Sequence, residues 1–350
     1  MSIKLVNREI GRSYRPFIIA EMSGNHNHSL GRAIEIVEAA AKSGVHALKL
    51  QTYTADTITI NVKEGEFFID NKDNLWKGQS LYELYQKAYT PWDWHESIMK
   101  RANELGMVCF STPFDETAVE FLEELNVPAY KIASSEIIHL PLVKKVAATG
   151  KPIIISTGMA NLEEIKDCVE IYKANSNRNF MLLHCVSNYP CSNQSLNMLV
   201  LPKLASTFNC LVGYSDHSVG NEAATISVTL GSVLIEKHFT IDKNLPGPDQ
   251  KTSVLPKEFY NLVQTVNRTK LILGKSEKKC QAEELQMATV SRKSLTLISP
   301  LKKGEKLSKK HVTLKRPGTG LFVKELQKLL GHKARKPLSV NHQIRHEDFD

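Results

Sequence analysis

The chain lacks the features that mark membrane and secreted proteins. None of its apolar runs, over 350 residues, approaches the ~20 residues that a bilayer-spanning helix needs. The first residues, MSIKLVNREIG, lack the apolar core of a secretory signal. The six cysteines are scattered and include no CxxC pair. We therefore expect a cytoplasmic protein with reduced, mostly buried cysteines.

Basic charge is concentrated near one end of the chain. The net charge is +8, and residues 275–350 hold 18 Lys and Arg against 8 Asp and Glu. A basic tail can bind nucleic acid, but here the lysines alternate with apolar residues, as in a small folded β unit. We expect neither a nucleic-acid nor a membrane partner. Attraction of anionic substrates is another physical use of this charge.

Eight short apolar runs, each ending in reactive polar residues, dominate the rest of the sequence. Continuous apolar stretches followed by helical patterns are typical of buried parallel strands. The runs are Phe17–Glu21, Ala47–Gln51, Val108–Thr112, Ala129–Ser134, Pro152–Thr157, Phe180–Ser187, Leu211–His217 and Val233–His238. This number and spacing predict an α/β protein with a (β/α)8 or TIM barrel, whose strand ends surround one active site.

The chain divides into two predicted domains. The barrel occupies residues 1–274, because its last helical pattern ends at Gly274. A charged linker is predicted over 275–288, and a small, mostly β domain over 289–350, where short apolar runs alternate with turn residues. An insertion over 54–94 holds Trp76, Trp92 and Trp94 and is expected to overhang the active site.

Two histidines at the ends of adjacent predicted strands indicate a metal site. His217 stands in SDH and His238 in EKH. Neighbouring strands lie about 4.8 Å apart, so the two imidazoles can share one divalent ion. With two protein ligands, such an ion keeps positions open for water and substrate. Asp216 and Glu236 either support these ligands or form salt bridges at the barrel rim.

Lysines and hydroxyl groups at other strand ends suit a phosphorylated substrate. Lys49 and Lys131 supply charge, and Ser134 and Ser156 supply hydroxyl donors. Glu21, followed by Asn25 and His26, offers a carboxylate that could transfer protons or bind sugar hydroxyls.

The strand-end motifs together resemble the sialic acid (nonulosonate) synthase family. The similar segments are IIAEMSGNHNHSL, KLQTY, FSTPFD, YKIASSE, ISTGM, LLHCVSNYP, GYSDH, IEKHF and GPDQKTS, followed by KRPGTGL in a domain similar to the antifreeze-like SAF domain. The resemblance implies a transferase that condenses phosphoenolpyruvate with an open-chain N-acetylated amino sugar. The products are a nine-carbon keto acid and phosphate.

The resemblance also implies roles for individual residues. His217 and His238 match metal ligands, with Mn2+ expected first and Mg2+ or Co2+ as alternatives. Catalytic roles are implied for Glu21, Glu136, His217 and His238. Contacts to phosphoenolpyruvate and the intermediate are implied for Lys49, Gln51, Thr112, Phe114, Lys131, Ser134 and Ser156. Contacts to the sugar are implied for Glu21, Glu136, Ser187, Tyr189 and Asp249. Arg316 matches an arginine that reaches the partner's active site in a domain-swapped homodimer.

Several readings of the substrate stay open. The first half resembles pseudaminic acid synthases, and the second half resembles sialic and legionaminic acid synthases. We choose pseudaminic acid, because the aromatic insertion overhangs the sugar end. One rival is a metal-dependent barrel aldolase or hydrolase on a phosphosugar, for which NHNH (residues 25–28) is a near-miss of an HxH ligand motif. Another is a non-catalytic carbohydrate- or ice-binding protein.

Overall fold

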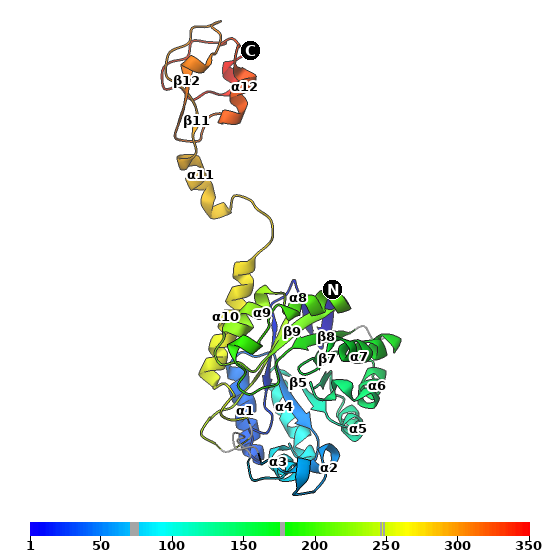
Figure 1. Cartoon of the computed structure of the whole chain (residues 1–350). Helices are drawn as coiled ribbons and strands as arrows, with labels where there is room; N and C mark the ends of the chain where they lie inside the picture. Colours follow the sequence, from blue (N-terminus) through cyan, green and yellow to red (C-terminus); the bar gives the residue numbers. More distant parts are fainter. Residues whose placement is uncertain (71–76, 176–178, 246, 248) are drawn as a thin grey trace. The chain divides into compact units, whose positions relative to one another are not determined.

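Eight parallel strands close into a barrel with helices around it (Figure 1). The structure is a computed structural model that describes residues 1–70, 77–175, 179–245, 247 and 249–350. Trp76, predicted to belong to the aromatic insertion, lies outside these residues. The strands are β3 (Phe17–Glu21), β4 (Ala47–Thr52), β5 (Val108–Pro113), β6 (Tyr130–Ile132), β7 (Ile153–Ser156), β8 (Phe180–His184), β9 (Leu211–Asp216) and β10 (Leu234–His238). The predicted TIM barrel is confirmed.

Helices follow the strands, and capping side chains mark the start of some of them. They are α1 (Leu30–Lys42), α4 (His95–Glu104), α5 (Glu116–Glu124), α6 (Leu140–Ala148), α7 (Leu162–Ala174), α8 (Val200–Phe208), α9 (Glu222–Thr229) and α10 (Pro256–Leu273). Ser29 caps α1, and Asn161 forms a capping box with Glu164 at α7. α8 ends at Asn209 in the left-handed conformation.

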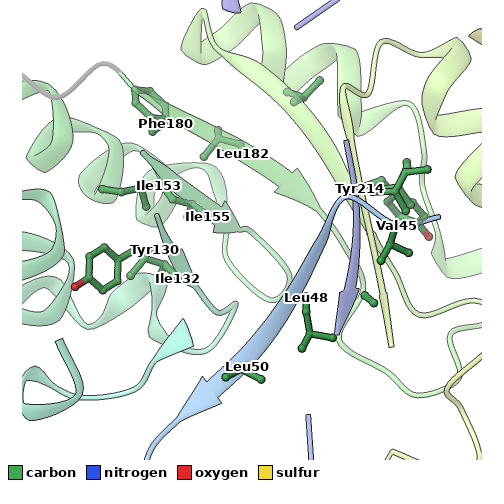
Figure 2. Close-up of a cluster of buried hydrophobic side chains, with 14 of the residues drawn as sticks. Val45, Leu48, Leu50, Tyr130, Ile132, Ile153, Ile155, Phe180, Leu182 and Tyr214 are labelled. Atoms are coloured by element: carbon green, nitrogen blue, oxygen red, sulfur yellow. The ribbon is translucent and has the colours of Figure 1, made fainter. Parts of the chain in front are cut away.

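Alternation along the strands separates two apolar layers. One set of side chains points outward beneath the helices, including Leu48, Ile132, Ile155, Leu182 and Tyr214 (Figure 2). The alternate set fills the barrel interior, as with Phe17, Ile19, Phe110, Ile154 and Leu183. Residues at the same parity but nearer the strand ends therefore face the interior at the barrel mouth.

An N-terminal hairpin, which the sequence analysis did not anticipate, joins the inner layer. Strands β1 (Ser2–Leu5) and β2 (Arg8–Gly11) pair antiparallel. Their Ile3, Leu5 and Ile10 belong to the same buried cluster as the inward-facing residues near the starts of the barrel strands. The hairpin thus closes the barrel at the end opposite the mouth.

The insertion between β4 and β5 contains short helices. These are α2 (Ala55–Ile58), η1 (Gly65–Phe67), α3 (Leu81–Ala88) and η2 (Trp92–Trp94). Trp92 stacks on Phe121 of α5 and Trp94 packs against the barrel core, so both hold the insertion down.

Residues Lys275–Asp350 form a second compact unit. Its strands β11 (Ser294–Leu297) and β12 (Val312–Lys315) pair antiparallel. Short helices complete it: η5 (Ala282–Glu284), α11 (Leu285–Ser291), η6 (Lys309–His311), η7 (Val323–Glu325), α12 (Leu326–Leu329) and η8 (His346–Asp348). A small leucine-rich core includes Leu295, Leu297 and Leu301. α11 begins inside the segment predicted as a linker.

None of the helices in the described ranges is both long enough and apolar enough to span a lipid bilayer.

Candidate active site

A cavity of about 260 Å³ opens at the carboxyl ends of the barrel strands. Its lining includes eleven of the predicted site residues: Lys49, Gln51, Thr112, Phe114, Lys131, Ser134, Ser156, Ser187, Tyr189, His217 and His238. These side chains come from five strands, and from the loops after β5, β6, β8 and β9, and thus meet around one space. A larger hollow of about 580 Å³ shares Tyr189 with it. We assign the site to the smaller cavity, because the lysines and histidines line that one.

The cavity floor is a buried network of two lysines and two glutamates. Lys49 forms an ion pair with Glu21, and its Nζ lies 3.9 Å from Glu236 Oε2. Lys131 Nζ donates to Glu236 Oε1 at 3.2 Å. Charges this deep are stable only when paired, so the network holds the two ammonium groups at defined positions.

The two carboxyl groups of this network have pKa values shifted in opposite directions. Burial raises the pKa of Glu21 despite the neighbouring Lys49. Burial would also raise the pKa of Glu236, but Lys131 and Lys49 outweigh it and lower that pKa to about 2. Glu236 is therefore the permanent anion here, whereas Glu21 is nearer to accepting a proton.

The lysines also have neutral neighbours that extend the site. Lys49 Nζ donates to Thr112 Oγ1 at 3.2 Å, and Gln51 Nε2 donates to Glu21 Oε1 at 3.1 Å. Ser156 Oγ is buried and has no hydrogen-bond partner among the described residues. A buried hydroxyl without a partner is a ready donor for an anionic ligand beside Lys131.

His217 and His238 face each other at the mouth. Their ring centroids lie 5.6 Å apart, and the Tyr189 ring packs 4.1 Å from His217 and 5.3 Å from His238. His217 Nδ1 donates to Val186 O at 2.8 Å, so Nε2 carries the lone pair, with Ser215 Oγ 3.4 Å away from it. Burial, together with the nearby His238, lowers the pKa of His217 to about 3, so its ring is neutral at physiological pH.

These two imidazoles fit a metal ion. His238 Nδ1 is buried without a hydrogen bond to any described group, although Asp249 Oδ2 lies 3.6 Å away. The ring separation suits two nitrogens at ~2.1 Å from one ion. Across the described ranges of the chain, no three His, Cys, Asp or Glu side chains form a metal-binding group. The arrangement therefore matches an open site with two histidine ligands.

Other predicted residues lie around this cavity. Asp249 accepts a short hydrogen bond from Ser23, in the loop after β3. Glu136 lies in η3 (Glu136–Ile138) after β6, where burial raises its pKa. Gly158 packs against the serines: a Cβ there would lie 2.5 Å from Ser134 Cβ and 2.6 Å from Ser187 Oγ. Arg316 belongs to the second unit.

Five residues that line the cavity were missing from the predicted binding set: Ala133, Ser135, Met159, Ser215 and Glu236. The last two belong to the charged network. Glu236 binds Lys131, and Ser215 donates to Glu236 Oε1 at 3.0 Å. The sequence carried a signal for Ser215 and Glu236. They stand two residues before His217 and His238, so they point to the same inward side as these histidines.

Three polar residues at or just after strand ends do not line the cavity and instead hold the structure around it. Asn25 donates to Phe239 O at 2.9 Å, and His26 Nε2 bonds Thr90 Oγ1 at 3.0 Å. His184 Nε2 bonds Leu196 O at 2.6 Å. Each of these side chains forms a hydrogen bond to a neighbouring segment. Residues near a strand end thus also hold the surrounding loops in place.

The chain is similar to known proteins along most of its length. The model of the NeuB family matches residues 36–278, and that of the SAF domain matches residues 292–350. A pseudaminic acid synthase of Helicobacter pylori is 39% identical, covering 96% of this chain and 98% of that protein. An N,N'-diacetyllegionaminic acid synthase of Legionella pneumophila is 41% identical, covering 94% and 93%.

A solved structure has a similar fold. The N-acetylneuraminic acid (sialic acid) synthetase of Leptospira borgpetersenii is 33% identical and matches with a TM-score of 0.73, covering 82% of this chain and 95% of that one. The resemblance seen in the strand-end motifs is thereby confirmed. This chain belongs to the NeuB family and carries an SAF domain after its barrel.

Proposed function

We propose that this protein is a pseudaminic acid synthase. It condenses phosphoenolpyruvate with an open-chain N-acetylated 6-deoxy amino sugar of the 2,4-diacetamido-2,4,6-trideoxy-altrose type, giving a nonulosonic acid and phosphate. The observation that carries this proposal is that one cavity joins two buried lysines and a serine hydroxyl, to which no described group hydrogen-bonds, to a facing histidine pair. A phosphorylated anion and a sugar aldehyde can thus be held side by side.

The lysine end of the cavity is the proposed phosphoenolpyruvate subsite. Lys49 and Lys131 exchange part of their pairing with Glu21 and Glu236 for the substrate's negative charge. The uncharged groups that complete this subsite are Gln51, Thr112, Phe114, Ser134 and Ser156. The proposed sugar contacts are Glu21, Glu136, Ser187, Tyr189, Asp249 and Arg316.

The family depends on a metal ion. We propose Mn2+, with Mg2+ or Co2+ as alternatives, held by His217 and His238. When bound, the ion supplies Lewis-acid polarisation of the aldehyde oxygen. Val186 O fixes the orientation of the His217 ring, so the ligand nitrogen needs no rearrangement.

The cavity orients the two substrates for carbon–carbon bond formation. C3 of phosphoenolpyruvate attacks the aldehyde carbon, and the aldehyde oxygen takes up a proton to become a hydroxyl group. Water then adds at C2, and the bond from C2 to the bridging oxygen breaks, so that phosphate leaves with that oxygen. Glu21 and Glu136, whose pKa values burial raises, are the groups available to hold a proton.

Aromatic contacts from the insertion favour a 6-deoxy sugar. Tyr85 of α3 packs edge-on against Tyr53 with centroids 5.8 Å apart, and Tyr53 packs against Phe114 at 5.1 Å. Phe114 lines the cavity. The two tyrosines hold the Phe114 ring in place, and this apolar ring suits a methyl group better than a hydroxymethyl group. Legionaminic acid synthesis is the second candidate, since the similar Legionella protein has that activity by name.

An assay of phosphate release tests the proposal. The purified protein is mixed with phosphoenolpyruvate, Mn2+ and one of three sugars, the precursors of pseudaminic, legionaminic and sialic acid. We expect sugar-dependent release, fastest with the pseudaminic precursor. Faster turnover of another sugar would change the assigned product. No release with any of them would favour the barrel aldolase, hydrolase or non-catalytic alternatives.

We further propose a cytoplasmic, domain-swapped homodimer in which Arg316 completes the partner's site. A mixture of Arg316→Ala and His238→Ala proteins tests this. In heterodimers, one site then carries both defects and the other carries neither, so activity should return after subunit exchange. Continued inactivity despite demonstrated exchange would place Arg316 in its own chain's site, and an Arg316→Ala protein that is active alone would place it outside any site.

A further inference from the structure

A second buried ion pair lies directly behind the two histidines. Lys237 Nζ is 2.6 Å from Asp216 Oδ2, and these side chains are 2% and 0% exposed. Lys237 Nζ also donates to Ser218 O at 2.7 Å. Asp216 Oδ1 accepts from Ser218 N at 2.9 Å and from Ser218 Oγ at 2.6 Å. We call Asp216, Ser218 and Lys237 the rim triad.

The rim triad stands on the opposite face of the strands from the active site. Asp216 and Lys237 are register partners in β9 and β10. Each immediately precedes a histidine, and side chains alternate along a strand, so the histidines face the cavity and the charged pair faces outward. The pair therefore joins the two histidine-bearing strands from behind, at the level where their ladder ends.

Charge is unusual in this outer layer. The same parity on the same strands gives Tyr214 and Ile235, and other strands place Leu50, Ile132 and Ile155 there (Figure 2). Apolar residues would serve stability as well or better, because desolvating two charges offsets much of their attraction. Stability alone thus gives no reason for an ion pair at this point.

An ion pair does supply what an apolar contact lacks, which is a defined distance and direction. Lys237 Nζ donates to Asp216 Oδ2 and to Ser218 O, and these two residues stand on either side of His217. Cys191 N donates to His217 O at 2.9 Å, which holds the same backbone from the next loop. The position of the His217 backbone along the barrel axis is therefore linked to Lys237, the residue before His238.

We propose that the rim triad is a positioning device that sets the separation of the two histidines for a shared metal ion. The proposal rests on the metal role assigned to His217 and His238 under the proposed function. Its residues touch neither substrate nor metal. They act by fixing the backbone on which the ligands stand, and their effect is on metal affinity.

The decisive variant is Asp216→Asn with Lys237→Met. It removes both charges, keeps an acceptor for Ser218 N, and leaves no unpaired buried ion. The matched control is Glu120→Leu with Lys145→Met, which removes a helix-surface ion pair. Mn2+ binding to the chelator-treated full chain is followed by electron paramagnetic resonance of free Mn2+, alongside the thermal midpoint and the KM for phosphoenolpyruvate.

The triad variant should bind Mn2+ about tenfold or more weakly, in the range found for groups that orient metal ligands. Its thermal midpoint and its KM for phosphoenolpyruvate at saturating Mn2+ should match the control. Wild-type Mn2+ affinity in a folded triad variant would overturn the proposal. If that variant does not fold, Ser218→Ala decides: weaker Mn2+ binding at an unchanged midpoint supports the proposal, and unchanged binding overturns it.

His217→Ala and His238→Ala separate this proposal from the function on which it rests. If they bind Mn2+ as tightly as the wild type, the metal assignment itself is wrong. If they lose Mn2+ while the triad variant and Ser218→Ala retain it, only the positioning role is wrong.

Discussion

The two halves of the barrel interior are built from the same strands but from opposite kinds of residue. In the lower half, Phe17, Ile19, Phe110 and Leu183 pack with the N-terminal hairpin into one apolar cluster. One or two inward positions further along, the strands carry Lys49, Lys131, Glu236 and the histidines around a cavity. A few ångströms along the barrel axis separate a filled core from a charged, hollow site.

This contrast shows how the fold divides its tasks. The lower half buries apolar surface and closes itself with its own hairpin, so it stabilises the barrel without needing a ligand. The upper half keeps four charges buried, which is tolerable only because they pair and because the rigid floor holds the pairs in place. Substitutions in the upper half, at the mouth, should therefore mainly change activity. Substitutions in the lower half, in the apolar cluster, should mainly change stability.

The largest expected effect is at the mouth. His217→Ala or His238→Ala should abolish divalent-ion-dependent turnover, because each removes a proposed metal ligand. The thermal midpoint should change little, since neither ring belongs to the apolar core. Activity is measured after chelation and Mn2+ add-back; wild-type activity in either variant would contradict the metal assignment.

Removing one lysine of the upper network should have the next largest effect. Lys131→Met should raise the KM for phosphoenolpyruvate or lower kcat by roughly tenfold or more, the loss of about one charge-assisted contact. Lys145→Met, on a helix surface, serves as the control. An effect confined to the KM of the sugar would place Lys131 outside the phosphate subsite.

Two glycines test the division between the halves directly. In the lower half, a Cβ at Gly213 would lie 2.5 Å from Leu183 Cδ2 and 2.7 Å from Leu234 O, so Gly213→Ala should lower stability by about 1–3 kcal/mol. At the mouth, Gly158→Ala displaces Ser134 and Ser187 and should reduce activity more than stability. Thermal midpoints and kcat/KM of both proteins are compared; the opposite pattern would refute the division.

The smallest expected effect is a pH dependence at the closed end. Burial, with Arg8 and Arg15 nearby, lowers the pKa of His46 from 6.5 to about 4. The unfolded chain therefore binds the proton more readily between these pH values. The stabilisation is complete above pH 6.5 and declines as pH falls toward 4.

His46→Asn should weaken this dependence, because Asn does not titrate yet can accept the Ile18 N–H that His46 Nδ1 accepts at 2.9 Å. Unfolding midpoints at pH 5 and pH 7.5 check this. An undiminished difference between the two midpoints would show that other groups carry the acid sensitivity.

Much of the site could be predicted because strand-end residues are local signals. His217, His238, Lys49 and Lys131 each follow an apolar run, and the barrel brings such ends together regardless of sequence distance. The hairpin over Ser2–Gly11 escaped prediction because its two strands are short and carry few apolar residues. Its apolar side chains acquire a partner only once the barrel exists.

The eight strands, their order and the chemistry that each brings to the mouth could be predicted, since these depend on periodicity and residue type. Which charges pair depends on the folded barrel. Lys131 meets Glu236 across 105 residues, and Asp216 meets Lys237 outside the barrel, although both carboxylates follow similar apolar runs. Alternation along a strand assigns each side chain a face once the register is set, but which groups meet on that face depends on how the barrel closes.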